Sequence, residues 1–185
     1  MTMNKNKLLD NVYEFASILV MSLIAICIIF TFFFKISTVV GESMENTLQN
    51  GDTVIINTIE NDVEYGDVVV ISQPNLYSKV LIKRVIAVEG QTIKFDADLG
   101  KVLIDDKEID EPYIKEAMRF TYAMQYTYTV PEGKVFVLGD NRNESADSRD
   151  PNVGFVDERY VLGKVLYRVG DTKIFNSDLK ELENG

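Results

Sequence analysis

The sequence contains no histidine and only one cysteine. Without histidine there can be no Ser-His-Asp triad, no Cys-His pair and no His-ligated metal site. The single cysteine, Cys27, lies inside a long apolar run, so a disulfide framework is excluded and thiolate chemistry is not expected. Any catalysis must therefore use Ser, Thr, Lys, Asp, Glu or Tyr.

Basic residues are also scarce. The chain has 19 Lys and Arg against 29 Asp and Glu, and from Ile36 onward the counts are 16 and 27. Nucleic-acid binding depends on the neutralisation of phosphates by basic residues, so no nucleic-acid partner is expected. The simplest interpretation of the acidic excess is solubility.

The longest uncharged stretch runs from Phe15 to Phe34, between Glu14 and Lys35. A helix rises about 1.5 Å per residue, so twenty apolar residues cover the roughly 30 Å hydrocarbon core of a bilayer. The run is longer than the apolar part of a cleaved signal peptide, and no small-residue cleavage site follows its bulky end at 32–34. We predict an uncleaved transmembrane anchor over 15–35, with the lipid bilayer as a partner.

The orientation of this anchor is predicted from the basic residues near its ends. Lys5, Lys7 and the α-amino group precede the run, whereas the far side has Lys35 and then no Lys or Arg until Lys79. Basic residues favour the cytoplasmic side. Residues 1–14 are therefore expected to be cytoplasmic and the rest of the chain extracytoplasmic.

Beyond the anchor the pattern is typical of short strands. Runs rich in Val, Ile, Tyr and Phe recur every 8–15 residues or so between turn residues, and long helical patterns are absent. The predicted fold class is mostly β, with one domain of antiparallel β-sheets over 36–170 and a polar tail over 171–185. The predicted strands are 53–57, 67–71, 80–88, 91–95, 101–104, 126–130, 135–138 and 161–169.

One lysine lies in the middle of an apolar strand. Lys83 occurs in V-L-I-K-R-V-I-A-V, and its neighbours on the same face are Leu81, Val85 and Ala87. A lysine can act as the base for a serine nucleophile only when it is neutral, and desolvation favours the neutral form. The alternative is an edge-strand lysine whose stem packs while its ammonium group reaches water.

Two polar segments could supply partners for this lysine. Ser43 follows Gly41 in a short linker after the anchor, and as a pattern alone it could be a turn residue. The segment 139–149 follows an apolar strand and contains Ser145, Asp147 and Arg149. Ser145 offers a hydroxyl group to an amine, and Asp147 with Arg149 could form an ion pair, although a surface loop would have the same composition.

Taken together, these segments resemble the type I signal peptidases, which are serine–lysine enzymes. The family's serine box, roughly G-x-S-M-x-P-T-L, is matched by G-E-S-M-E-N-T-L at 41–48, and its lysine box by K-R-V-I-A-V-E-G-Q at 83–91. The box G-D-N-R-x-x-S-x-D-S-R is matched in full at 139–149. Gly66-Asp67-Val68-Val69 and the stretch 110–114 add to the likeness, which covers about 36–170 in the family's order.

The resemblance implies a role for each matched position. Ser43 would be the acylated nucleophile and would hold the oxyanion with its backbone N–H, and Lys83 would be the general base. Ser145 would orient the Lys83 amine, while Asp147 and Arg149, with Arg84, would brace the site. The walls of the substrate pocket would be Val39, Val40, Met44, Leu48, Leu81 and Ile82.

The chain departs from the family pattern at two places beside the nucleophile. Gly41 stands where some members carry a second, side-chain donor for the oxyanion, and one such donor contributes roughly 3–4 kcal/mol. Asn46 stands where the family usually has proline, so the turn is expected to be less rigid. The short interval between Lys83 and Gly139 indicates a compact member without a large inserted domain.

The function implied by the resemblance is removal of signal peptides from exported pre-proteins, after small residues at positions −1 and −3. No cofactor and no metal are implied. Two other classes stay open: a peptidase of the same chemistry dedicated to one substrate, and a tethered β domain that binds proteins without catalysis. Repressor-type self-cleaving proteins also pair Ser with Lys, but they are soluble, and the anchor counts against them.

Overall fold

The computed structural model describes residues 5–59, 62–74, 79–96, 98–119 and 127–170. The chain forms two compact units, residues 1–35 and residues 36–185. The predicted tail at 171–185 and the first four residues lie outside the described residues.

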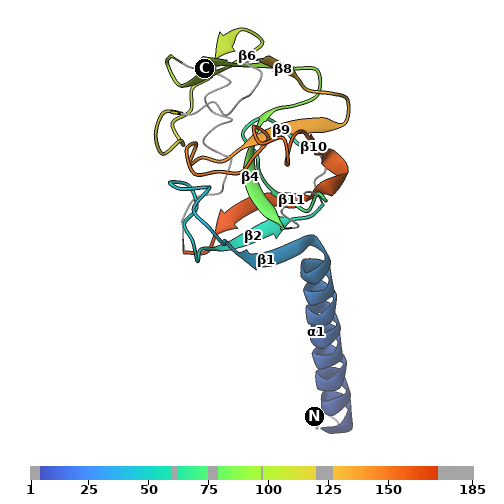
Figure 1. Cartoon of the computed structure of the whole chain (residues 1–185). Coiled ribbons are helices and arrows are strands. Elements are labelled where there is room, and N and C mark those ends of the chain that lie inside the picture. The colour runs from blue at the N-terminus through green and yellow to red at the C-terminus, as the bar shows by residue number, and fades with distance from the viewer. Residues whose placement is uncertain (1–4, 60–61, 75–78, 97, 120–126, 171–185) are drawn as a thin grey trace. The chain divides into compact units, whose positions relative to one another are not determined.

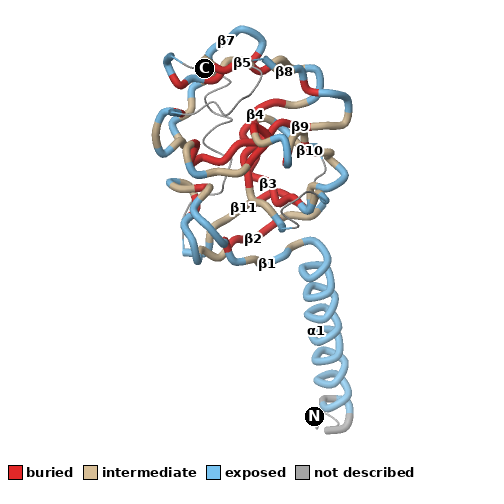
Figure 2. Tube along the Cα trace, viewed as in Figure 1, coloured by how far each residue is buried: buried red, intermediate tan, exposed pale blue. Residues whose placement is uncertain are grey.

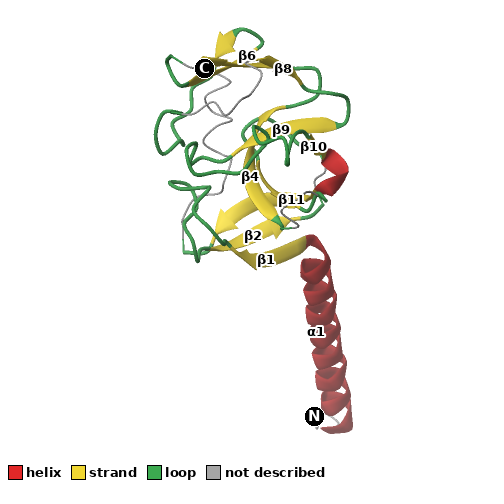
Figure 3. Ribbon diagram, viewed as in Figure 1, coloured by secondary structure: helices red, strands yellow, loops and turns green. Residues whose placement is uncertain are grey.

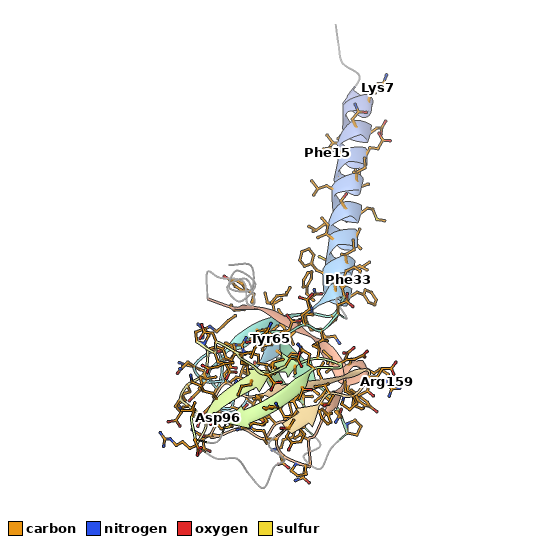
Figure 4. The ribbon with its side chains drawn as sticks, turned by 90° about the horizontal axis from the view of Figure 1, so that it is seen from above. Lys7, Phe15, Phe33, Tyr65, Asp96 and Arg159 are labelled. Atoms are coloured by element: carbon orange, nitrogen blue, oxygen red, sulfur yellow. The ribbon has the colours of Figure 1, made fainter. Side chains whose placement is uncertain are left out.

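The first unit is a single helix, α1 (Lys5–Phe33), drawn in blue in Figure 1. Within it, Leu9–Phe33 has a mean hydropathy of 2.7, and its side chains are not buried by protein. Figure 4 shows the side chains from Lys7 to Phe33 projecting outward all round the helix. A helix of this length and composition is long enough to cross a membrane.

The helix differs from the predicted anchor at both ends. It begins ten residues before Phe15, and its apolar span already starts at Leu9. It ends at Phe33, and the next two residues open strand β1 rather than closing the helix. The hydroxyl groups of Ser22 and Thr31 donate to carbonyl oxygens four residues earlier, so these polar side chains are satisfied within the helix.

The second unit is built from antiparallel strands, shown as yellow arrows in Figure 3. A seven-stranded sheet has the order β1-β2-β11-β3-β4-β9-β10, and a four-stranded sheet has the order β7-β6-β5-β8. The strands of the large sheet are β1 (Phe34–Thr38), β2 (Thr53–Asn57), β3 (Val68–Ile71), β4 (Leu81–Ala87), β9 (Lys134–Leu138), β10 (Val156–Asp157) and β11 (Val161–Arg168). The small sheet contains β5 (Thr92–Asp96), β6 (Lys101–Ile104), β7 (Lys107–Glu108) and β8 (Thr127–Thr129), and a 3-10 helix, η1 (Glu158–Tyr160), precedes β11.

Alternating side chains divide the large sheet into two apolar faces. Val68 and Val70 of β3 pack in one cluster with Val54 and Val165, whereas Val69 packs in another with Val85 of β4 and Val135 and Val137 of β9. Such alternation follows from the two-residue period of a strand. Both faces of β3 are covered, which explains why its four residues are all buried; Figure 2 shows the buried strands in red.

A third cluster joins the two sheets. Phe136 and Leu138 of β9 pack against Ile93 and Phe95 of β5 and Val102 of β6. Aromatic rings of this cluster meet edge to face or tilted, as aromatic pairs prefer. This shared core fixes the end of β9, after which the polar segment 139–149 begins.

The predicted fold class is confirmed: apart from α1 and the short η1, the described elements are antiparallel strands. All eight predicted strands are present, with ends shifted by one or two residues in most cases. Strands β1, β7 and β10 were not predicted. β7 and β10 have only two residues each and carry no periodic signal, and β1 follows the apolar helix α1 without a break.

Strand β4 has a different neighbour on each of its two edges. It pairs with β3 throughout Leu81–Arg84, with Lys83 opposite Val69. On its other edge it pairs with β9 only from Arg84 onward. Among the described strands, the segment Leu81–Lys83 therefore has one edge without a strand partner.

A buried lysine on β11, Lys164, gives a test of the fold. Lys164 of β11 lies 2.9 Å from Asp67, and both side chains are buried. Replacing Lys164 with Met should leave the Asp67 carboxylate without this cation and lower the free energy of unfolding by about 3 kcal/mol or more. Denaturant unfolding of the full chain in detergent, followed by circular dichroism, measures the change.

The matched control is Lys94→Met, which removes an ion pair with Asp106 at an exposed site. Its expected effect is below about 1 kcal/mol. Equal losses in the two variants would contradict a special contribution of the buried pair.

Candidate functional site

Ser43 and Lys83 are brought together from segments forty residues apart. Lys83 lies on β4 and donates a hydrogen bond of 2.6 Å from Nζ to Ser43 Oγ. Lys83 is only 3% exposed, so the alternative of an edge-strand lysine with its ammonium group in water is wrong. The contact has the geometry that a base and a nucleophile require.

The surroundings of Lys83 shift its titration. Burial lowers the pKa of Lys83 from 10.5 to about 8, against the opposing charges of Asp147 and Asp140, and the Arg149 charge lowers it further. At a pKa of about 8, about a tenth of the amine is neutral at pH 7, compared with about 0.04% of an ordinary lysine. The site therefore holds a lysine that can accept a proton near neutral pH.

The turn that carries Ser43 is anchored on both sides. Met44 and Leu48 are buried in the core, and the Leu48 N–H donates to the Met44 carbonyl at 2.8 Å. The N–H of Asn141 donates to the Ser43 carbonyl, and its side-chain amide donates to the Glu42 carbonyl, both at 3.1 Å. Asn141 therefore links the turn that carries Ser43 to the loop after β9.

Two residues before Ser43, the backbone adopts a conformation that favours glycine. Gly41 has φ +100°, a conformation that residues with a β-carbon rarely adopt, and its N–H donates to Asn50 Oδ1 at 3.0 Å. The Ser43 N–H donates no hydrogen bond within the described residues. With no side chain at 41, that position adds no second donor.

Arg84 is paired with a carboxylate that the sequence did not single out. Its guanidinium donates to Asp140 at 2.9 and 2.7 Å and to the Gly66 carbonyl at 2.8 Å, and it stacks 4.0 Å from the Tyr113 ring centre. Thr47 also donates to Asp140. Arg84 thus ties β4 to the first residues of the loop after β9.

Asp147 and Arg149 form the ion pair that their spacing suggested. Arg149 donates twice to Asp147, at 2.8 Å each, and once to the Arg142 carbonyl at 2.7 Å. Asp147 also accepts from the Gly139 N–H at 3.0 Å. Burial alone would raise the pKa of Asp147, but the hydrogen bonds and charge of Arg149 outweigh it and lower that pKa. These charge-assisted hydrogen bonds therefore hold the loop 139–149 in a fixed conformation.

Ser145 differs from its predicted placement. Its hydroxyl oxygen is buried and has no hydrogen-bond partner among the described residues, so the predicted bond to Lys83 is not made. The Lys83 amine instead donates to Ser43, while the Ser145 side chain packs against Gly139. A β-carbon at Gly139 would overlap Ser145 Oγ and would lie 2.5 Å from the Ser43 carbonyl oxygen.

An apolar cleft of about 190 Å³ adjoins Ser43 and Lys83. Its walls come from the segment around β1 and from the start of β4, and they include five of the six residues predicted to line the pocket: Val39, Val40, Met44, Leu81 and Ile82. Leu48 is the exception, because its side chain is wholly buried in the core cluster that also contains Met44. Ser37, Thr38, Gly41, Val70 and Val80 complete the lining.

Several residues that hold the site together were missed. Asp140, Asn141 and Arg142 follow Gly139 directly, and Arg142 is fully buried in an ion pair with Glu111. The signal was present, since a run of charged residues directly after a buried strand is unusual unless its members are paired. Among the described residues, no group of His, Cys, Asp and Glu could hold a metal ion.

Comparison with known families places the chain among the peptidases. Residues 12–169 match the sequence model of the family described as signal peptidase, peptidase S26. Because the match covers most of the chain, the chain belongs to this family, and the resemblance of the three boxes is confirmed. The family's function is the removal of signal peptides. The apolar helix α1 together with the family indicates a membrane-anchored protein.

The relatives carry the same description. Signal peptidase I of Bacillus licheniformis is 32% identical over 166 residues, which span 83% of this chain and 86% of the relative. Signal peptidase I U of Bacillus subtilis strain 168 is 32% identical over 172 residues, with 85% and 90% covered. The crystal structure of a signal peptidase I from Enterococcus faecalis V583 is 29% identical, with a TM-score of 0.44, and covers 56% of this chain and 96% of that one.

The contact at Gly139 gives a test of the site. In Gly139→Ala the new β-carbon would meet the Ser43 carbonyl, which is backbone and cannot rotate away. A displacement of the nucleophile by about 1 Å is expected to lower kcat/KM for pre-protein cleavage about a hundredfold, with the fold retained by circular dichroism.

Gly154→Ala is the matched control, because a β-carbon there meets only one atom, at 3.9 Å. Gly154 has φ +58°, so this variant should lose about 1 kcal/mol of stability and keep its activity. Full activity in folded Gly139→Ala would contradict the crowding described above.

Proposed function

We propose that the chain removes N-terminal signal peptides by acyl transfer to Ser43, with Lys83 as the general base. The observation that carries the proposal is the 2.6 Å contact between Ser43 Oγ and the buried amine of Lys83. The lowered pKa of Lys83, about 8, makes that amine a usable base near neutral pH.

The first half of the reaction forms the acyl-enzyme. Neutral Lys83 takes the proton of Ser43 Oγ as this oxygen attacks the scissile carbonyl carbon. The resulting oxyanion accepts a hydrogen bond from the Ser43 N–H. Protonated Lys83 then gives its proton to the leaving amine, the carbon–nitrogen bond breaks, and the mature chain departs.

The second half releases the signal peptide. Neutral Lys83 takes a proton from a water molecule, and the resulting hydroxide attacks the ester carbonyl of acylated Ser43. The tetrahedral intermediate collapses, Lys83 returns the proton to Ser43 Oγ, and a carboxylic acid leaves. Proton and bond changes balance over the cycle, and no redox cofactor is required.

Four residues are proposed to position this pair without touching the substrate. Arg84 holds Asp140 close to β4, and Asp147 with Arg149 fixes the loop whose Asn141 grips the nucleophile's turn. Ser145 would orient the amine once its hydroxyl turns toward Lys83. That role fits a hydroxyl that is buried and lacks another partner among the described residues.

The substrate is proposed to bind as an extended strand with small residues at −1 and −3. The cleft of about 190 Å³ favours small side chains, and the unpaired edge of Leu81–Lys83 can accept backbone hydrogen bonds from an added strand. Replacement of alanine at −1 by phenylalanine should stop cleavage. Unchanged cleavage of that substrate would remove the small-pocket proposal.

The chain is proposed to work outside the membrane, with residues 1–14 in the cytoplasm, 15–35 in the bilayer and 36–170 extracytoplasmic. The apolar span of α1 and the basic residues before it support this topology. Protease protection in sealed inside-out vesicles should leave the catalytic domain intact; its digestion there would reverse the orientation.

The roles of Ser43 and Lys83 can be tested by substitution. Purified full-length chain in detergent at pH 8 should cleave a pre-protein after a small residue. Ser43→Ala, Lys83→Ala and Lys83→Arg should each lose at least about a thousandfold in rate, because arginine cannot give up its proton. Lys94→Ala, which changes an exposed lysine on β5, is the control and should cleave normally.

The outcomes separate the remaining alternatives. No cleavage by any form, with several pre-proteins, would favour a dedicated substrate or a binding role. Equal rates for all forms would mean a contaminating peptidase and would remove the assignment of Ser43 and Lys83.

The proposed base also fixes the pH profile. Lys83 acts when neutral and is protonated below its pKa of about 8. The value of kcat/KM should therefore fall about tenfold per pH unit below that point, to about 1% of its plateau at pH 6. Initial rates across pH 5 to 10, with circular dichroism to show a folded protein, measure this; a flat profile from pH 5 to 8 would rule out Lys83 as the base.

A further inference from the structure

A second cleft lies on the outer side of the loop after β9. It has a volume of about 470 Å³ and is lined by Asn143, Glu144, Ser145, Arg149, Asp150 and Pro151, together with one alanine. This size falls within the range of about 300–1,000 Å³ that is usual for ligand clefts. Unlike the cleft beside Lys83, its lining is mainly polar and charged.

One polar group in the lining of this cleft lacks a partner. Arg149 Nη1 is buried and makes no hydrogen bond within the described residues. Arg149 is only 2% exposed, and its other donors are already used by Asp147 and the Arg142 carbonyl. Buried polar groups are nearly always paired, so Arg149 Nη1 points to a ligand that brings a hydrogen-bond acceptor, such as the carbonyl of a peptide.

The two clefts lie close together near Gly139. Ser43 lines the apolar cleft and Ser145 lines the loop cleft, and a β-carbon at Gly139 would overlap Ser145 Oγ and lie 2.5 Å from the Ser43 carbonyl oxygen. An extended peptide advances about 3.3 Å per residue. A chain whose scissile bond lies at Ser43 and whose preceding residues fill the apolar cleft therefore reaches the loop cleft within a few residues.

The edge of the loop cleft carries uncompensated negative charge. Glu144, which lines the cleft, is exposed, as is Glu42 in the segment before Ser43. Neither forms an ion pair among the described residues, and both segments are held to Asn141. The nearby carboxylates Glu45 and Glu116 are different, because they pair with Lys115 and Arg119. Arg149 does not offset this charge, since Asp147 neutralises it.

We propose that the loop cleft binds the first residues of the mature chain beyond the scissile bond, and that Glu144 favours a basic side chain there. Arg149 Nη1 would donate to a backbone carbonyl of this segment. The inference rests on the proposed signal-peptide cleavage and adds a substrate preference to it.

The test uses two pre-proteins that differ only at the second to fourth residues after the cut, which are all Lys in one and all Glu in the other. For the wild-type chain, kcat/KM should be higher for the Lys substrate. Glu144→Lys should lower the ratio of the two values by at least about fourfold, because each attraction becomes a repulsion. The wild-type preference should shrink in 0.5 M salt, since exposed charges are screened.

Glu132→Lys is the matched control, because it makes the same charge change at an exposed turn before β9, at the other end of that strand from Gly139. This variant should keep the wild-type ratio. Equal ratios in wild type and Glu144→Lys, with both substrates cleaved, would overturn the loop-cleft proposal and leave the proposed function intact. If the wild type cleaves neither substrate, both the loop-cleft proposal and the proposed function are overturned.

Discussion

The site depends on holding the Lys83 amine against Ser43 in a place where a charge is costly. Burial brings the pKa of Lys83 to about 8, which corresponds to about 3 kcal/mol less stabilisation of the ammonium form than in water. Two carboxylates, Asp140 and Asp147, act in the opposite direction. Each is paired with an arginine, Arg84 or Arg149, and without these pairs the carboxylates would keep Lys83 protonated.

The same pairs also form the frame of the site. Arg84 follows Lys83 on β4, so the strand that carries the proposed base also carries the cation that binds Asp140. Asp140 belongs to the loop whose Asn141 grips the carbonyl of Ser43. The electrostatics and the positions of the two reacting groups are therefore set by one set of contacts, and the shared core of the two sheets fixes where that loop starts.

Much of the fold could be predicted because strands carry a local signal. Runs of Val and Ile such as Val68–Ile71 are buried on both faces and stand out from the turns between them. Lys83 was also visible, since a lysine among apolar neighbours must be either buried or at an edge. The pattern could not choose between these two, because the choice depends on β3 and β9, which are distant in sequence.

The rest of the site required long-range contacts that no local pattern contains. Ser43 and the segment 139–149 stood out through the family resemblance, not through their composition. The pairing of Arg84 with Asp140 joins residues 56 positions apart and was missed. Leu48 has the apolar character of a pocket wall but lies in the core, and the helix begins at Lys5, before the uncharged run that set the predicted start of the anchor.

The most direct test of the account is the titration of the Lys83 amine itself. Full-length chain in detergent, with lysines labelled by ¹³C at Cε, gives one NMR signal for each lysine environment, and Lys83→Arg identifies the signal of Lys83. The account predicts a titration midpoint of about 8 for Lys83. A midpoint near the ordinary 10.5 would contradict it, because Lys83 would then be almost fully protonated at neutral pH and could not serve as the base.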